Sequence, residues 1–254
     1  MIVTPIKTRK VLPGALSIEA LLDEALPALS EQSIVVVTSK VVSLCENNVR
    51  PLEGTDREAL LREEAELYFV DDRGKTEKRL YNFTIKQKTL IPASGIDLSN
   101  SGGCYILWPR DPLASAEAIR QHLMQRDGLQ QVGVIITDST IGLSRWGTLG
   151  IAIGHSGFEP VKDYIGTPDL FGRTLMLSKS NLAGGLAAAA VAVMGEGAEQ
   201  TPIAVIEAAN GVDFWQADQT TGNPGVYYIS PLDDDPFQPF FASAKWEKGG
   251  KFHD

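Results

Sequence analysis

The stretch Val132–Ser139 constrains the fold more than any other part of the sequence, because an apolar run stops abruptly at polar residues. Its apolar part, residues 132–136, is β-branched apart from one glycine. Runs of this kind are typical of strands that are buried on both faces. Asp138 and Ser139 follow almost directly. A buried strand that ends at a carboxylate and a hydroxyl predicts a functional site at its end.

A second apolar run, Ile34–Val37, has the same character and leads into Thr38, Ser39 and Lys40. Hydroxyl and ammonium groups both donate hydrogen bonds, which suits the oxygens of a phosphate. We therefore expect Ser39 and Lys40 to contact phosphate. The apolar residues that come next, Val41–Leu44, predict a further strand.

Two more carboxylates stand in unusual local sequences, Asp97 within Ser94–Asn100 and Glu196 within Met194–Gly197. Their neighbours are small or polar, unlike those of the acids on helical faces. Carboxylate and hydroxyl oxygens are the ligands of hard divalent cations such as Mg²⁺. Two metals about 4 Å apart would brace a nucleotide triphosphate. We predict one metal site from Asp97, Asp138 and Glu196; the alternative is three unrelated turn and capping acids.

The remaining elements are predicted from periodicity, caps and turn residues. Strands are expected at 2–12, 104–108 and 202–207, and helices at 18–29, 56–69, 181–194 and from Ser115 onward. Gly195 is expected to end the helix 181–194, so Glu196 opposes the helix dipole unless a cation compensates it. Lys7, Arg9 and Lys10 are interpreted as part of a solvated edge strand, and the segment after residue 207 as peripheral.

Composition limits the class of partner. The chain has 254 residues, a formal net charge of -9 and a pI near 4.9. An extended basic surface for nucleic acid or an anionic membrane is therefore not expected, and the substrate should be small. Two cysteines without C-x-x-C spacing, together with the lack of a signal-peptide pattern, predict a cytoplasmic protein. The most apolar run, Leu182–Met194, is too short to span a bilayer. We treat residues 1–254 as one folding unit, with two lobes as the alternative.

Common catalytic motifs are missing from the sequence. The histidines at 122, 155 and 253 form no H-E-x-x-H motif and no convincing Ser-His-Asp set. His155 lies in a glycine-rich segment, where it either touches the substrate or is a buried structural residue. There is no Walker A motif and no strand-borne G-x-G-x-x-G, so any nucleotide is bound in a less common way.

Several separate motifs resemble one enzyme family. They occur in the order and spacing of the coenzyme F420-0:γ-glutamyl ligases, and the resemblance extends from about Ile34 to Glu207. The motifs are Val35–Lys40, Gly95–Asn100, Val134–Ser139, Gly150–Gly154, Asp169–Arg173 and Met194–Gly197.

The resemblance implies a fold, cofactors and site residues. It implies an α+β fold with mixed sheets and packed helices, assembled as an intertwined homodimer. It also implies an amide ligase that uses GTP or ATP with Mg²⁺ or Mn²⁺. The family's metal ligands fall on Asp97, Asp138, Ser139 and Glu196. Its nucleotide contacts fall on Ser39, Lys40, Asn100 and the segment 194–201, including Gly195, Gly197 and Thr201.

Two departures from the family pattern bear on the substrate. Leu44 stands where the family usually has a lysine, and the arginine that normally follows the metal-binding aspartate is displaced to Arg145. The neighbouring Trp146 adds an aromatic face that could stack on a flat ring. This variant resembles the bacterial branch associated with folate metabolism. We therefore expect a folate-like or an F420-0-like acceptor together with L-glutamate.

The implied reaction activates an acceptor carboxylate as an acyl phosphate, which the amine of glutamate then attacks. Asp138, Arg145 and Arg173 are the predicted catalytic residues. Arg145, Arg173 and Lys162 are candidates for gripping phosphate or carboxylate groups, with surface ion pairs as the alternative. Two other functions stay open: a metal-dependent phosphohydrolase, and a nucleotide-binding homologue that has lost catalysis.

Overall fold

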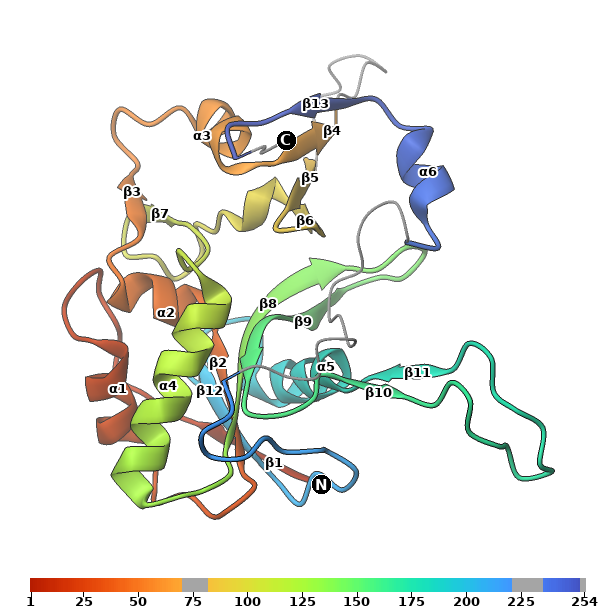
Figure 1. The fold of residues 1–254 in the computed structure, drawn as a ribbon. Coiled ribbons are helices and arrows are strands. Elements are labelled where there is room, and N and C mark those ends of the chain that lie inside the picture. Colours follow the sequence, from red (N-terminus) through yellow and green to blue (C-terminus); the bar gives the residue numbers. More distant parts are fainter. Residues whose placement is uncertain (70–81, 221–234, 252–254) are drawn as a thin grey trace.

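A five-stranded mixed sheet forms the centre of the molecule (Figure 1). The computed structural model describes residues 1–69, 82–220 and 235–251. The pair β2–β8 is parallel, and the other neighbours are antiparallel. In spatial order the strands are β1 (Ile2–Ile6), β12 (Ile203–Glu207), β2 (Ile34–Thr38), β8 (Gly133–Ile141) and β9 (Thr148–Ser156).

The two apolar runs form the strands β2 and β8, as predicted. Residues 34–37 and 134–136 are fully buried, and alternate side chains enter the cores on opposite faces of the sheet. Strand β8 continues through Asp138 and Ser139 to Ile141 instead of ending before them. The pairing of β8 with β9 shifts register between Ile136 and Thr137. An irregularity of this kind redirects the side chains that follow it.

Helices cover both faces of the sheet (Figure 1). On one face, α1 (Ile18–Ala25), α2 (Ser39–Cys45) and α4 (Pro112–Asp127) contribute to one apolar core. The opposite face is covered by α5 (Leu182–Met194), whose alanines let it lie close to the strands. A Cβ at Gly150 of β9 would come within 2.5 Å of a Val191 methyl carbon. Among the described residues, no helix is both long and apolar enough to cross a bilayer.

A second, smaller group of elements lies beside the main sheet. Its four-stranded sheet has the order β13 (Trp246–Lys248), β4 (Leu67–Phe69), β5 (Phe83–Lys86), β6 (Thr89–Pro92). The helices of this group are α3 (Arg57–Glu64) and α6 (Gln238–Ala242). A short helical turn, Ala93–Gly95, follows β6. A separate two-stranded pair, β3 (Val49–Pro51) with β7 (Cys104–Ile106), connects the group to the main sheet. The small group has its own core around Leu60 and Leu107.

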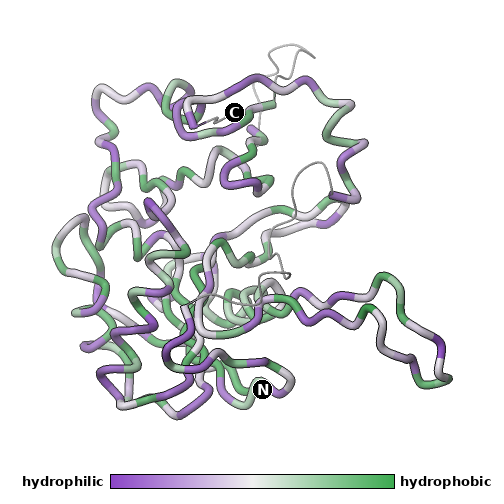
Figure 2. Tube along the Cα trace, in the orientation of Figure 1, coloured by the Kyte–Doolittle hydropathy of each residue, from purple (hydrophilic) through white to green (hydrophobic). Residues whose placement is uncertain are grey.

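A long hairpin arm extends away from the body (Figure 1). Its base is formed by β10 (Val161–Asp163) and β11 (Lys179–Asn181). Leu170 is 98% exposed and Phe171 is 95% exposed, and Leu177 also faces solvent. Hydrophobic stretches are visible along the arm in Figure 2. An arm with this many exposed apolar side chains is typical of a protein interface.

Several predicted elements differ from the structure; the strand expected at 2–12 ends at Ile6, and the helix expected at 18–29 ends at Ala25. Val41–Leu44 belongs to the helix α2 and not to a strand, since a short apolar run has no periodicity that separates a strand from a buried helix. The helix expected over 56–69 ends at Glu64, and β4 follows it. The helix expected from Ser115 starts at Pro112, because Asp111 caps it by accepting from two backbone N–H groups.

The segment after residue 207 is only partly peripheral. Within it, β13 pairs with β4 and so completes the small sheet. Trp246 packs edge-on against Phe69, with the ring centroids 5.8 Å apart. Residues 221–234 and His253, which belong to the same segment, lie outside the described residues.

Candidate functional site

A cavity of about 590 Å³ lies at the end of β2, beside β8. Segments that are far apart in the sequence form its wall. They are the N-terminal residues 8–12, the β2–α2 junction, the loop 95–102, β8 at 137–139 and the loop 194–202. Thr8 and Gln200 join two of these segments, because each donates a hydrogen bond to the other's backbone carbonyl.

Asp138 is the most deeply desolvated acid of the cavity. Its Oδ1 accepts from the Ser139 backbone N–H at 2.9 Å, and its Oδ2 accepts from the indole N–H of Trp108. Burial raises the pKa of Asp138 to about 6, against the opposing effect of the Trp108 and Ser139 hydrogen bonds. The negative charge of Asp97 raises this pKa further, while Lys40 lowers it. A neighbouring cation would therefore stabilise Asp138 in its charged form.

Asp97 forms an ion pair with Lys40. The Lys40 Nζ lies 2.7 Å from Asp97 Oδ2 and donates to Ser99 Oγ at 2.8 Å. The Ser99 backbone N–H donates to Asp97 Oδ1 at 2.6 Å. Burial alone would raise the pKa of Asp97, but Lys40 and Ser99 outweigh it and hold the pKa below its usual value. Asp97 is thus charged at neutral pH, and the Lys40 ammonium is its cationic partner.

Glu196 connects the loop after α5 to the β8–β9 hairpin. Its Oε1 accepts from Ser139 Oγ at 2.7 Å and from Thr148 Oγ1 at 3.1 Å. Gly195 has a φ of 83° and ends α5 with a backbone bond to Val191, as expected. This conformation is accessible to glycine and rarely to other residues. The helix end therefore turns sharply and presents Glu196 to the cavity.

The rest of the loop 194–201 is fixed by its own polar groups. Thr201 Oγ1 donates to the Met194 carbonyl at 2.6 Å, and Gly197 N–H donates to Glu199 Oε2 at 2.8 Å. Asn100 Nδ2 donates to the Gly197 carbonyl at 2.9 Å, which ties this loop to the Asp97 loop. Two of the loops that carry predicted ligands are thus joined directly.

The structure brings most of the predicted site residues into this cavity and leaves others outside it. Lining residues include the predicted metal ligands, the predicted nucleotide contacts and Leu44: Ser39, Lys40, Leu44, Asp97, Asn100, Asp138, Ser139, Gly195, Glu196, Gly197 and Thr201. Arg145 lies on the β8–β9 turn, where it donates to the Ser144 carbonyl. Arg173 lies on the arm, and Lys162 at the arm's base donates to the Gly211 carbonyl.

The acids share the cavity without forming a ready-made metal cluster. Across residues 1–69, 82–220 and 235–251, no group of three His, Cys, Asp or Glu side chains is placed to hold an ion. Asp97 is paired with Lys40, and Glu196 with two hydroxyls. The donor set of carboxylate and hydroxyl oxygens nevertheless fits a hard divalent cation in its chemistry. An ion would need Asp97 to leave Lys40.

Two features of the cavity escape the sequence patterns. Arg9 and Lys10, interpreted as part of a solvated edge strand, line the cavity because β1 already ends at Ile6. The cluster of basic residues is the signal that could have revealed them. Trp108 is the second feature: it does not line the cavity itself but donates to Asp138, which does, and its position after an apolar run suggests only a core residue.

His155 and His122 lie away from the cavity. His155 packs edge-on against Phe158 and Trp215, at centroid distances of 5.9 and 6.1 Å. Burial lowers the pKa of His155 to about 4, so the ring is neutral at physiological pH. His122 Nε2 lies 2.7 Å from Asp23 Oδ1. Of the two interpretations of His155, the placement favours the buried structural one.

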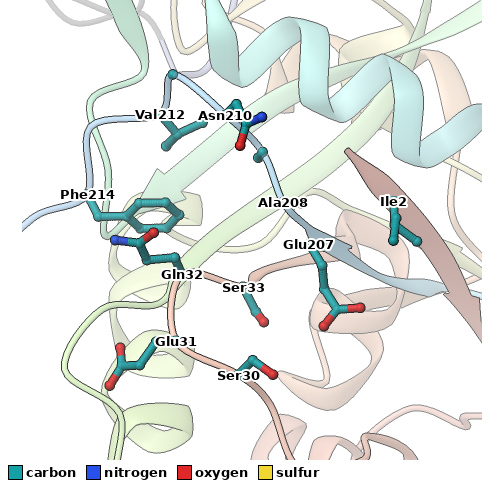
Figure 3. A pocket seen from close by; sticks show the side chains of 12 residues that line it. Ile2, Ser30, Glu31, Gln32, Ser33, Glu207, Ala208, Asn210, Val212 and Phe214 are labelled. Atoms are coloured by element: carbon teal, nitrogen blue, oxygen red, sulfur yellow. The ribbon is translucent and has the colours of Figure 1, made fainter.

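A second hollow of about 560 Å³ lies at the opposite end of the main sheet (Figure 3). Ser30, Gln32 and Glu207 line it together with the loop 208–214. Glu31 is also part of the wall, but its carboxylate accepts from the backbone N–H groups of residues 130 and 131 at 2.8 Å. None of the predicted site residues lines this hollow.

Comparison with known proteins establishes the family. The model of the F420-0:gamma-glutamyl ligase family matches residues 5–208. A coenzyme F420:L-glutamate ligase of Archaeoglobus fulgidus is 36% identical over 189 residues, covering 70% of this chain and 76% of the relative. Those of Methanococcus maripaludis and Methanocaldococcus jannaschii are 36% and 32% identical, each over 83% of this chain and 86% of the relative.

The chain therefore belongs to the F420-0:γ-glutamyl ligase family. It is an enzyme of the amide-bond-forming ligase class. The predicted family resemblance is confirmed, and the mixed α+β architecture agrees with it.

Proposed function

We propose that this chain is a nucleotide-dependent γ-glutamyl ligase that joins the amine of L-glutamate to a carboxylate of a folate-like or F420-0-like acceptor. The shared cavity carries the proposal, because Asp97, Asp138 and Glu196 line the same space as Lys40. Relatives that are 32–36% identical are named coenzyme F420:L-glutamate ligases, which supports glutamate as one substrate.

Mg²⁺ or Mn²⁺ suits the acids of the cavity. Asp97, Asp138, Ser139 and Glu196 would hold the metal, which when bound supplies positive charge against the phosphates of GTP or ATP. Asp97 would be free to serve as a ligand once its contact with Lys40, 2.7 Å long, is released. The freed ammonium then binds a phosphate oxygen. Lys40 would thus hold the acid in place before the metal binds and contact the nucleotide afterwards.

The proposed reaction has two steps. An oxygen of the acceptor carboxylate attacks the γ-phosphorus, the bond to the β-phosphate oxygen breaks, and an acyl phosphate and a nucleoside diphosphate form. The nitrogen of glutamate then attacks the acyl carbon, loses a proton, and inorganic phosphate leaves as the amide forms. Charge on the transferred phosphoryl group needs most stabilisation, which favours Lys40 and Ser39 as donors to it.

Basic and aromatic residues suggest how the acceptor is recognised. Arg9 and Lys10 line the cavity, and both can bind an anionic group of the acceptor or of glutamate. Trp146 is fully exposed at the β8–β9 turn, on the hairpin whose Ser139 and Thr148 bind Glu196. A flat pterin or deazaflavin ring could stack on this indole.

The exposed arm supports a homodimer. Leu170, Phe171 and Leu177 would bury their apolar surface against a second copy of the chain. Arg173 lies on this arm, away from the cavity of its own chain, so we propose that it acts at the partner's surface. Arg145, at the β8–β9 turn, remains a candidate for gripping substrate at the rim.

Mass spectrometry tests the ligase activity directly. The protein is incubated with glutamate, Mg²⁺, GTP or ATP, and separately with dihydropteroate, tetrahydrofolate and F420-0. We expect one acceptor to gain a glutamyl unit in step with nucleoside diphosphate release. Asp138→Asn should abolish the product while circular dichroism stays unchanged. Glu207→Gln, in the second hollow, is the matched control and should retain activity.

Two outcomes would contradict the proposal in different ways. Phosphate release at full rate without glutamate would indicate a phosphohydrolase. Binding of nucleotide and Mg²⁺ without amide product from any pterin or deazaflavin acceptor would indicate a homologue without catalysis. Leu44 and the displaced arginine would then be the first positions at which to restore the family's usual residues.

A further inference from the structure

Trp108 joins the hydrophobic interior to the acid-lined cavity. Its side chain is 2% exposed, and its indole N–H donates to Oδ2 of Asp138. The residue follows β7, and its carbonyl accepts from Asn48 Nδ2 at 2.7 Å. A buried tryptophan needs an acceptor for its N–H, and a backbone carbonyl would serve that need. Here the acceptor is instead the most desolvated carboxylate of the proposed site.

A buried cation lies over the same indole ring. Lys86 Nζ is 5.7 Å from the ring centroid and pairs with Glu64 at 2.8 Å. A cation over an aromatic face attracts its π electrons. The ring N–H thereby becomes a stronger donor to the carboxylate, since linked polar groups in a dry interior polarise one another. The small sheet, through Lys86, thus acts on Asp138 of the main sheet.

Gly95 leaves room for the Trp108 indole beside the loop that carries Asp97. A Cβ at Gly95 would lie 2.0 Å from the indole Nε1, and its φ is +67°. Any larger residue would displace the ring from its place beside Asp138. Gly95 is also close in sequence to Asp97, so the indole abuts the loop that carries this second acid. Trp108 therefore contacts both the Asp138 carboxylate and the start of the loop that carries Asp97.

We propose that Trp108 is a positioning residue of the site: its N–H holds the Asp138 carboxylate in the orientation that receives a divalent cation. With one oxygen bonded to Trp108 and the other to the Ser139 N–H, the carboxylate cannot rotate, and its remaining lone pairs have fixed directions. The inference rests on the proposed function. It adds a residue that is not among the predicted metal ligands or nucleotide contacts.

The test replaces the N–H without changing the shape of the side chain. Incorporation of 3-benzothienylalanine at position 108 puts sulfur in place of the N–H, and Trp108→Phe is a second, genetically simple variant. Mn²⁺ affinity is measured by electron paramagnetic resonance of the free ion, in the absence of substrates. We expect both variants to bind Mn²⁺ about 10- to 100-fold more weakly. kcat should fall, and KM for glutamate should change little.

Trp215→Phe is the matched control. Trp215 is also a buried indole, and its N–H donates to the carboxylate of Glu159 at 3.1 Å, outside the cavity. Loss of that hydrogen bond should leave Mn²⁺ affinity and kcat unchanged, even if the thermal midpoint falls as much as in the Trp108→Phe variant. A purely structural role of Trp108 would instead make the two variants alike.

The outcomes separate this inference from the ligase proposal. Unchanged Mn²⁺ affinity in the benzothienylalanine variant would overturn the positioning role, as would absence of Mn²⁺ binding by the unmodified protein. Weakened Mn²⁺ binding in the benzothienylalanine variant would support the positioning role of Trp108, whether or not any acceptor is glutamylated. Failure to glutamylate any acceptor would overturn the ligase proposal alone.

Discussion

The buried ion pair between Glu64 and Lys86 allows a prediction of stability with a defined magnitude. Each residue is 6% exposed, and the charged atoms are 2.8 Å apart. Burial lowers the pKa of Lys86, and the nearby Glu64 carboxylate opposes this effect. The pair thus lies in a poorly solvated part of the small sheet. Removing either partner leaves a buried charge without its counterion.

Lys86→Met removes the ammonium and keeps most of the aliphatic stem. The Glu64 carboxylate then keeps its contact with Lys251, which is 3.9 Å long and whose ammonium side chain is half exposed. The free energy of unfolding should fall by about 3–5 kcal/mol, the usual cost of breaking a buried pair. The double variant Glu64→Leu with Lys86→Met removes both charges. Its free energy of unfolding should be within about 1 kcal/mol of that of the unmodified protein, or higher.

Urea unfolding, followed by tryptophan fluorescence and circular dichroism, measures these differences at pH 7. Glu63→Gln on the same helix is the control, because its contact with Arg50 is 3.9 Å long and exposed, and it should change stability by less than about 0.5 kcal/mol. A loss below about 1 kcal/mol in Lys86→Met would refute the reasoning. It would mean that solvent reaches the pair and replaces the lost cation.

Three other predictions concern pH, substrate charge and assembly. The pKa of His155 is about 4 in the folded protein and about 6.5 in the unfolded chain, so the free energy of unfolding should fall by about 2–3 kcal/mol as the pH drops from 6.5 to 4. His155→Phe should reduce this loss, as measured by urea unfolding at several pH values. An unaltered loss would contradict the buried, neutral state of His155. Replacement of Arg9 and Lys10 by Ala should raise KM for one anionic substrate about tenfold at low salt, and less at high salt; equal effects at both ionic strengths would argue against a charge contact. Phe171→Ser should weaken self-association in sedimentation velocity, and an unchanged profile would exclude the arm from the interface.

Sequence patterns identify the centre of the fold well. Ile34–Val37 and residues 132–136 are apolar on both strand faces, and only burial between two layers satisfies such runs. The acids at 97, 138 and 196 are distinguished by their small and polar neighbours, and all three line the same cavity. Local composition is informative here because the polar residues follow directly from the buried strands.

Other parts of the site depend on contacts that local sequence does not encode. Val41–Leu44 forms a helix because the chain turns at the end of β2, which buries Val41 and Val42 in the core of the main sheet and Leu44 against the β3–β7 pair. Trp108 has the appearance of any core aromatic, and its bond to Asp138, 30 positions further along the chain, exists only in the folded protein. The position of Arg173 on a projecting arm follows from the hairpin's length and not from its own neighbours.

The loops around the cavity are held by bonds between distant parts of the chain, which has a consequence for folding. Ser139 and Glu196 are 57 positions apart, Asn100 and Gly197 are 97 apart, and Thr8 and Gln200 are 192 apart. Closing such long loops costs entropy before any contact is gained, so these bonds should form late. Partly folded chains would then lack the cavity, and with it the site that we propose for the nucleotide, so the proposed binding should appear only when the whole chain has folded.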